Sequence, residues 1–472
     1  MTHSRLVPMI VAVALFMDNM DSTVIATSLP AIAADIGTNP LTLKLAVTSY
    51  LLSLAVFIPM SGWTADRFGA RTVFRAAIAV FVLGSIGCAL SNSLSDFVIA
   101  RILQGMGGAM MTPVGRLVLV RTVDRKELIN AMAWVSIPAM IGPLMGPPLG
   151  GFITTYFSWH WIFLINVPIG LIGIVLVTRY IENVHAEARE GFDAVGMVLS
   201  GAAVAGLTFG LSVAGFEIVP WPVAVAIVAA GAVAAALYTA YARRVVAPIL
   251  DFTLLRLPTF RASLVGGFLF RIGVGAMPFL LPLLLQIGFN LTPLQSGLIT
   301  FTSTLGALFM KAAASWALKR YGFRNMLIWN AILGGLFIAA CAGFTGTTPF
   351  PVMIAVLMIG GFFRSLQFTS INALAYAEVP ASRMSRATAL AAVGQQVSLA
   401  TGVAIGALTV EIVVRLKDQP TMMASDFPPG FLLVGFLAAS SALIFWLLPP
   451  HAGAEMANRV PAATSASDQR MG

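Results

Sequence analysis

Six charged side chains lie inside long apolar stretches of this chain, where an ionised group is costly. They are Asp18, Asp21, Arg101, Arg271, Lys311 and Arg364. A charge at the centre of a bilayer costs about 2.5–3.5 kcal/mol on insertion scales, so each one needs a structural or chemical reason. Asp18 and Asp21 are three residues apart and therefore share one face of a helix. Burial favours a protonated carboxyl group and a nearby cation favours the ionised form, so a carboxyl subject to both can take up and release a proton.

The apolar stretches themselves decide the class of protein. Of the 472 residues 58% are hydrophobic and only 10% are charged, and the mean hydropathy is +0.90. Soluble domains carry roughly 25% charged residues, so this chain cannot cover a water-facing surface. Cys88 and Cys341 both lie in apolar runs, which argues against a disulfide or a metal site, and no phosphate-binding glycine loop followed by lysine is present. We expect no metal, no cofactor, no nucleic-acid partner and no enzyme.

Apolar runs long enough to cross a bilayer, about 20 residues each, recur along the chain. The first begins at the N-terminus and contains two aspartates, so it is expected to be a membrane helix rather than a cleaved signal peptide. Fourteen spans are predicted, near residues 6–29, 42–62, 72–92, 97–118, 128–152, 159–178, 195–215, 221–241, 262–286, 295–318, 325–345, 350–373, 385–411 and 430–449.

The basic residues segregate to one side of this predicted membrane. With a cytoplasmic N-terminus, the inner side receives Arg67, Arg71, Arg75, Arg121, Arg125, Lys126, Arg243, Arg244, Arg256, Arg261, Lys319, Arg320, Arg324, Arg383 and Arg386. The outer side receives only Lys44, Arg415 and Lys417. Basic residues favour the cytoplasmic side of the membrane, so both termini are predicted to be cytoplasmic. The expected location is the cytoplasmic (inner) membrane of a bacterium.

An internal repeat divides the chain. Trp63, Arg67, Gly69 and Arg71 are matched by Trp316, Arg320, Gly322 and Arg324 at a constant offset of 253 residues, which also places Gly360–Gly361 on Gly107–Gly108. We therefore predict an N-terminal six-helix bundle (1–180), two inserted transmembrane helices with linkers (181–258), and a C-terminal six-helix bundle (259–450). A disordered cytoplasmic tail (451–472) is predicted to follow.

At these residues the chain resembles the major facilitator superfamily. The loop from Gly62 to Arg71 is similar to the signature between its second and third helices, and the run from Arg101 to Ala109 to its fourth-helix motif. The segment from Gly142 to Gly151 resembles the fifth-helix motif of drug–proton exchangers. Residues 20–30 and 159–170 resemble the fourteen-helix drug:proton antiporter branch. The resemblance implies an all-α membrane fold of two six-helix bundles plus two inserted helices.

The resemblance also implies roles for the charged residues. Asp21 occupies the position that the family uses in proton coupling, Arg101 is its expected partner, and Asp18 is a second candidate. On helical geometry Asp21 lies about 12 Å and Arg101 about 7 Å from the outer ends of their helices, so they can pair. The alternative is a static ion pair that fixes the first helix against the fourth. Which aspartate carries the proton stays open.

A substrate cavity is expected between the two halves. Its candidate residues are the charged or polar side chains Arg271, Arg364, Gln104, Asn166, Gln286 and Gln367. Arg271 takes the repeat position of Asp18, and either binds an anionic group of the substrate or pairs with Asp18. Lys311 lies near a helix end, from which its amine can reach the interface, and Glu411 is expected to be solvated.

Two further motifs are predicted to control opening. Gly62, Asp66, Arg67, Gly69 and Arg71 form a candidate inner gate. In this gate Asp66 either caps the N-terminus of a neighbouring helix or pairs with Arg116 or Arg121; the alternative is ordinary topology-setting charge. A second motif comprises Gly142, Pro143, Gly146, Gly150 and Gly151. Its glycines permit close helix packing, and its prolines remove backbone donors. The alternative, generic packing of small residues, explains the closeness but not the clustered prolines.

Together these features predict a proton-coupled antiporter that exports small organic molecules or drugs by alternating access. It is expected to act as a monomer, with the substrate, protons and the bilayer as its partners. One alternative is a proton-coupled exporter of a hydrophilic organic anion, which Arg271 and Arg364 favour. The other is a membrane sensor or enzyme that transports nothing.

Overall fold

The structure, a computed structural model, describes residues 3–123, 128–183, 191–214, 219–245, 248–380, 383–418, 421–450 and 452–453. Side chains at 3–5, 121, 128–134, 136–137, 139–140, 311–316 and 319 fall outside the description. The side chain of Lys311 and nearly all of the predicted tail at 451–472 are therefore not covered. Within the described residues the secondary structure is entirely helical.

The N-terminal half holds nine α-helices. They are α1 (His3–Val24), α2 (Leu29–Asp35), α3 (Lys44–Phe57), α4 (Ser61–Phe68), α5 (Ala70–Ala89), α6 (Leu94–Thr122), α7 (Leu128–Tyr156), α8 (Trp161–Leu164) and α9 (Asn166–Tyr180). Short helices α2 and α8 lie between spans, and α4 continues α3 after a 3-10 turn, Ile58–Met60.

The remainder comprises two helices and then six more. The former are α10 (Ala194–Val213) and α11 (Trp221–Ala242). The latter are α12 (Pro258–Leu283), α13 (Pro293–Tyr321), α14 (Phe323–Ala340), α15 (Phe350–Ala375), α16 (Met384–Leu416) and α17 (Pro428–Trp446).

The predicted spans correspond closely to these helices. Twelve helical segments of the described chain are long and apolar enough to cross a bilayer. The other two predicted spans coincide with α7 and α13, which have 29 residues each and contain side chains outside the description. The all-helical membrane architecture is thus confirmed, and the count of fourteen stays a prediction for these two helices.

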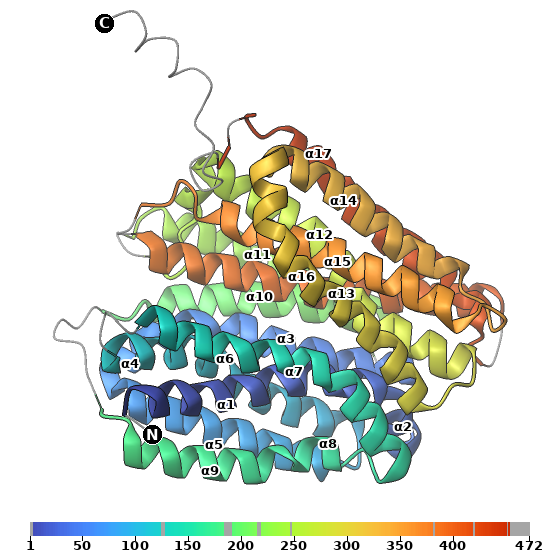
Figure 1. Cartoon of the computed structure of the whole chain (residues 1–472), viewed down its shortest axis with the longest axis horizontal. Helices are drawn as coiled ribbons and strands as arrows, with labels where there is room; N and C mark the ends of the chain where they lie inside the picture. Colours follow the sequence, from blue (N-terminus) through green and yellow to red (C-terminus); the bar gives the residue numbers. More distant parts are fainter. Residues whose placement is uncertain are drawn as a thin grey trace, which may run out of the picture.

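The two halves repeat each other's helix packing. In the N-terminal half α1 packs on α7, α3 on α6, and α5 on α9. In the C-terminal half α12 packs on α16, α13 on α15, and α14 on α17, which are the same pairs in the same order. The two bundles form the lower and upper layers of Figure 1. The repeat read from a few motif residues therefore extends to the arrangement of whole helices.

The motif residues of the repeat have equivalent structural roles. Gly69 and Gly322 each end a helix with a positive φ, 87° and 76°, a conformation that favours glycine. Arg71 donates to a backbone carbonyl just beyond the end of α9 (3.4 Å), and Arg324 donates to one at the end of α17 (3.0 Å). Arg71 thereby ties α5 to the end of α9, and Arg324 ties α14 to the end of α17. Each arginine satisfies a carbonyl left free by a helix end.

Two seams join the halves, and each pairs one helix from either side. In the seam of α7 with α13, a Cβ added at Gly151 would lie 2.9 Å from Leu294 Cα, so glycine is required for this approach. The backbone N–H of Leu294 donates to Thr155 Oγ1 at 3.1 Å, and Gln286 Nε2 donates to the carbonyl of Thr27 at 2.9 Å. These contacts lie at the end of the bundle that the topology predicts to be outside, here called the outer end.

The second seam, between α3 and α16, carries the inserted pair. Helix α10 packs on both α3 and α16, and α11 packs on α10. Figure 1 shows α10 running between the two bundles. The insertion thus covers a joint between the halves rather than extending one of them. The exact boundaries assigned to the three parts stay predictions.

Candidate functional site

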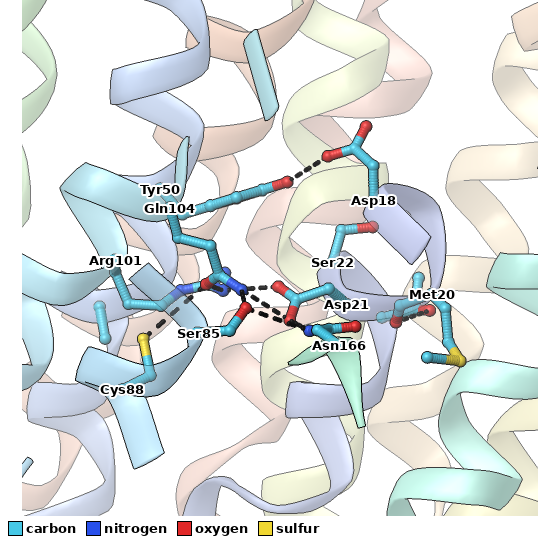
Figure 2. Close-up of polar contacts among 12 residues, drawn as sticks. Asp18, Met20, Asp21, Ser22, Tyr50, Ser85, Cys88, Arg101, Gln104 and Asn166 are labelled. Atoms are coloured by element: carbon cyan, nitrogen blue, oxygen red, sulfur yellow. Dashed lines mark hydrogen bonds and ion pairs between the residues drawn. The ribbon is translucent and has the colours of Figure 1, made fainter. Parts of the chain in front are cut away.

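The carboxyl group of Asp21 lies at the centre of a buried polar network that joins α1, α6 and α9 (Figure 2). Arg101 Nη1 lies 2.8 Å from Asp21 Oδ2, and the two side chains are 1% and 0% exposed. The amides of Gln104 and Asn166 both donate to Asp21 Oδ1 at 2.8 Å. A carboxylate removed from water thus receives three donors, one of them cationic, which is the arrangement that a buried charge needs.

A second set of contacts fixes the orientation of the two amides. Ser85 Oγ on α5 accepts from Gln104 at 2.8 Å and from Asn166 at 3.3 Å. The Gln104 Oε1 atom accepts from Arg101 Nη1 at 2.5 Å and from Cys88 Sγ at 3.8 Å. The oxygen of Gln104 therefore faces the cation and its NH₂ group faces the anion. The sequence analysis did not predict Ser85 and Cys88 as members of this network. The signal that could have identified them is their spacing, three residues apart in one apolar span.

Glycines in α5 and α6 bring the two helices close enough to build this network. A Cβ added at Gly84 would lie 2.6 Å from Gln104 Cα, and one at Gly107 would lie 2.8 Å from Phe81 Cα. Arg101 and Gln104 are three residues apart and share one face of α6. The fourth-helix motif thus supplies both the polar side chains and the glycines that set their distance from α5.

Asp18 has a different environment from Asp21. It is half-buried, and its Oδ1 accepts one hydrogen bond from the Tyr50 hydroxyl at 2.8 Å. The ring of Tyr50, which is itself 2% exposed, lies beneath Arg101 with 4.1 Å between the guanidinium carbon and the ring centroid. Arg101 therefore contacts Asp21 directly and is connected to Asp18 through Tyr50, a residue that sequence reasoning missed.

The predicted cavity residues do not form one cluster. Gln104 and Asn166 are fully buried around the Asp21 carboxyl, whereas Gln286 lies in the helical turn Leu284–Gly288 after α12 and donates to the carbonyl of Thr27 at the outer end. Gln367 is also fully buried, and it donates to the carbonyl of Leu327 at 3.0 Å within the C-terminal half. Arg271 and Arg364 belong to that half too.

Arg271 and Arg364 have only neutral partners among the described residues. Arg271 donates to Asn372 Oδ1 at 2.8 Å and does not pair with Asp18. Arg364 donates to the carbonyl of Gly360 at 3.3 Å and to the hydroxyl of Ser303. The predicted pairing of Arg271 with Asp18 is therefore absent from this arrangement of the described residues.

A charged cluster joins three parts of the chain at the outer end. Lys44, at the start of α3, is 0% exposed, and its Nζ lies 3.9 Å from Glu411 Oε2 on α16. The same amine donates to the carbonyl of Ala214 at the end of α10, at 3.4 Å. Glu411 also accepts from Arg415 at 2.8 Å. The expectation that Glu411 is solvated was wrong: it is 6% exposed because α3 and α16 enclose it.

The candidate inner gate lies where α4 meets α5. A Cβ added at Gly69 would come within 2.6 Å of the Asn183 side chain, whose Oδ1 accepts from the backbone N–H of Thr72 at 3.3 Å. The ring of Trp63 packs on Phe192 with 4.4 Å between centroids. The side chain of Arg121, one predicted partner of Asp66, lies outside the described residues. The charge lock of this motif stays a prediction.

The fifth-helix glycines make one continuous contact with α1. A Cβ added at Gly142, Gly146 or Gly150 would lie 3.0 Å from Met20 N, 2.8 Å from Thr23 Cβ and 2.8 Å from Thr27 Oγ1 respectively. The three glycines are spaced four residues apart, so they form one face of α7. Pro143 lies inside this helix, which runs without interruption from 128 to 156. This contact places α7 against the helix that carries Asp18 and Asp21.

Neither a metal site nor a disulfide occurs in the described part of the chain. It has no group of three or more His, Cys, Asp or Glu side chains that could hold a metal ion. Cys88 and Cys341 are buried and free.

Comparisons of sequence and of structure with known proteins support the fold. A model of the Major Facilitator Superfamily matches residues 11–194 and 263–467. Proteins named "Putative multidrug resistance protein MdtD" from Salmonella heidelberg and Salmonella paratyphi A are each 39% identical over 405 residues. Each match covers 84% of this chain and 85% of the relative.

Solved structures with the same fold are transporters. A nucleoside transporter, NupG, has a TM-score of 0.66 at 13% identity, covering 93% of this chain and 98% of that one. A D-xylose-proton symporter has a TM-score of 0.66 at 14% identity, covering 95% and 98%. The human organic anion transporter MFSD10 has a TM-score of 0.61 at 14% identity, covering 94% and 99%. At such low identity these structures support the fold alone.

Proposed function

Because the chain belongs to the major facilitator superfamily, we propose that it is a proton-coupled antiporter that exports small organic molecules across the bacterial inner membrane. Its relatives are named multidrug resistance proteins, which favours drug-like substrates. The proposal includes cytoplasmic termini and a monomeric protein. The observation that carries it is the buried Asp21 carboxyl with its three donors.

Protonation of this carboxyl would change the packing of three helices. Arg101 donates to one oxygen of Asp21, and Gln104 and Asn166 donate to the other. A proton added to either oxygen points at a donor, so the surrounding hydrogen bonds must rearrange. It also removes the negative charge that neutralises Arg101 in a water-excluded site. Proton binding is therefore coupled to the contacts of α1 with α6 and α9.

Asp18 provides a route between this network and the space around α1. It is half-buried, whereas Asp21 is fully enclosed. It accepts a hydrogen bond from the Tyr50 hydroxyl, and the Tyr50 ring contacts Arg101. We propose that Asp18 takes up and releases protons, and contacts the substrate, in the predicted cavity between the two halves. Arg101 and Tyr50 then connect the charge of Asp18 to that of Asp21.

Alternating access would use the two seams between the halves. At the outer end the Gln286, Thr155 and Lys44 contacts hold the halves together. Outward opening must break these contacts, while the motif at Gly62–Arg71 would then close the inner end. If a proton and the substrate cannot occupy the Asp21 site at the same time, each proton released to the cytoplasm is matched by substrate released outside.

The test is substrate-driven proton flux in proteoliposomes that contain a pH-sensitive dye. Lipophilic cations and small organic acids are screened on wild type, on Asp21→Asn and on Asp18→Asn. An exposed aspartate near the start of α6 provides the matched control, Asp96→Asn. We expect flux in wild type and control, and loss of flux in Asp21→Asn. Substrate movement without proton movement, unchanged in Asp21→Asn, would refute the coupling.

A further inference from the structure

Two guanidinium groups lie within the C-terminal half, and the described residues offer neither of them a carboxylate. Arg271 is 4% exposed, on α12, and its polar partner is the amide oxygen of Asn372 on α15. Arg364 bonds a hydroxyl and a backbone carbonyl. In the N-terminal half, by contrast, Arg101 is neutralised by Asp21. A buried cation with neutral partners only is unfavourable, so it is suited to receive an anion from outside the chain.

Polar groups around Arg271 are also left without partners. The Nε–H of Arg271 and the hydroxyl of Ser263 are both buried, and neither has a hydrogen-bond partner within the described residues. Ser263 is 2% exposed and lies two helical turns before Arg271 on α12. Buried polar atoms in proteins are nearly always satisfied, so two such atoms at one place mark a site for a missing partner.

These groups line one small cavity between α12, α15 and α16. Its walls include Ser263, Arg271 and Asn372, together with apolar side chains such as Leu264 and Ile371. The Phe368 ring, on α15, lies 5.1 Å from the guanidinium carbon of Arg271. The cavity thus places one cation and two neutral polar groups beside an apolar wall, in a space of about the size of one water molecule.

A glycine makes room for the guanidinium. Gly267 lies one turn before Arg271, and a Cβ added there would come 2.8 Å from Arg271 Nη1 and 2.9 Å from Ile371 Cγ2. Any larger residue would push the guanidinium away from Asn372. The position of the cation is therefore built into the packing of α12 against α15.

We propose that Arg271, Ser263 and Asn372 form a binding subsite for an anionic oxygen group, a carboxylate or phosphate, of the exported molecule. This inference rests on the proposed transport function and specifies its substrate class. Leu264 and Ile371 adjoin the anionic group, and the carbon skeleton of the molecule would extend beyond this small cavity. A phospholipid headgroup presents the same chemistry, so the test separates the two sources.

The experiment measures equilibrium binding of radiolabelled benzoate to the full chain in nanodiscs of zwitterionic phosphatidylcholine. Benzamide, which has the same shape without the charge, is the competitor. We expect saturable binding of benzoate that benzamide does not displace. Arg271→Gln should weaken it at least tenfold, Ser263→Ala severalfold, and Arg271→Lys less than Arg271→Gln. The control Arg243→Gln removes an exposed arginine and should bind as wild type does.

Three results would overturn the proposal. These are equal benzoate binding by Arg271→Gln, equal displacement by benzamide, or loss of the Arg271-dependent binding when phosphatidylglycerol replaces a part of the phosphatidylcholine. The last result would assign the site to lipid. Thermal unfolding of Arg271→Gln and the partial activity of Arg271→Lys separate lost binding from lost folding. Asp96→Asn, an exposed position on α6, should bind benzoate as wild type does. Binding is measured without transport, so a chain that binds benzoate through Arg271 but moves no protons contradicts the coupling proposal alone, and one that moves protons but does not bind benzoate contradicts the anion subsite alone.

Discussion

The ion pair of Asp21 with Arg101 allows a quantitative test by a double-mutant cycle. In Asp21→Asn, one oxygen and one NH₂ group replace two acceptor oxygens. If the NH₂ takes the place of Oδ2 it faces Arg101 Nη1, and if it takes the place of Oδ1 it faces the amides of Gln104 and Asn166. Either orientation puts donor against donor and leaves the buried cation without an anion.

The expected loss follows from this geometry. Removing one partner of a buried ion pair costs about 3–5 kcal/mol, because the other charge stays buried and unpaired. For a folding unit of 150–250 residues each kcal/mol lowers the melting temperature by roughly 2–4 °C. The melting temperature of Asp21→Asn should therefore fall by roughly 6–20 °C. Arg101→Gln should fall too, because it leaves the carboxyl without its cation.

The double variant decides whether the two losses share one cause. Asp21→Asn combined with Arg101→Gln has no uncompensated charge, so it should be more stable than Asp21→Asn alone. The assay is thermal unfolding of the purified proteins in one detergent, followed by intrinsic fluorescence. A melting temperature of Asp21→Asn within 2 °C of wild type, or a double variant whose loss is the sum of the two single losses, would refute this account of the network.

Three other predictions concern the α3/α16 seam, the contact of α7 with α1, and Asp18. Glu411→Gln removes the anion at the outer end of the α3/α16 seam, so a cysteine introduced there should react faster with a membrane-impermeant maleimide; an unchanged rate would show that the charge does not hold the seam. Gly146→Val should melt roughly 2–12 °C lower because its side chain would overlap α1, at a cost of about 1–3 kcal/mol and roughly 2–4 °C per kcal/mol. Gly62→Ala, where an added Cβ meets nothing within 4 Å, should melt as wild type does. Tyr50→Phe removes a hydroxyl that bonds Asp18, so substrate-driven proton flux should fall severalfold while the melting temperature changes little; equal flux would exclude Tyr50 from coupling.

Local sequence patterns predicted the fold well because membrane helices follow simple rules. Apolar runs of about 20 residues place the helices. The orientation that the basic residues indicate stays a prediction. The repeat could be found because Gly69 and Gly322 need a backbone conformation that glycine tolerates best. The pairing of Asp21 with Arg101 was also predictable, since few charged residues lie in apolar spans and their depths along the helices agree.

Contacts that depend on the packing of distant helices were not predictable. Ser85 and Tyr50 are uncharged residues of a kind that occurs in many apolar spans, and only the approach of α5 and α3 to α6 brings them into the network. Glu411 was misjudged because it lies near a helix end, where side chains usually reach water. Its burial results from Lys44, which enters the same seam from the other half of the chain. A single-sequence pattern contains no information on which ends meet.

The hydrogen bond from Lys44 to the carbonyl of Ala214 has a consequence for the surrounding lipid. Helix α10 is tied at its end to the amine that also joins α3 to α16, and α11 packs on α10. If the halves separate at the outer end, this carbonyl either loses its donor or moves with α3, and the pair α10–α11 moves with it. Most of α11 faces away from the protein, so such a movement displaces bilayer area. The elastic properties of the membrane then contribute to the free energy of opening, and lipid composition becomes a variable of the turnover rate.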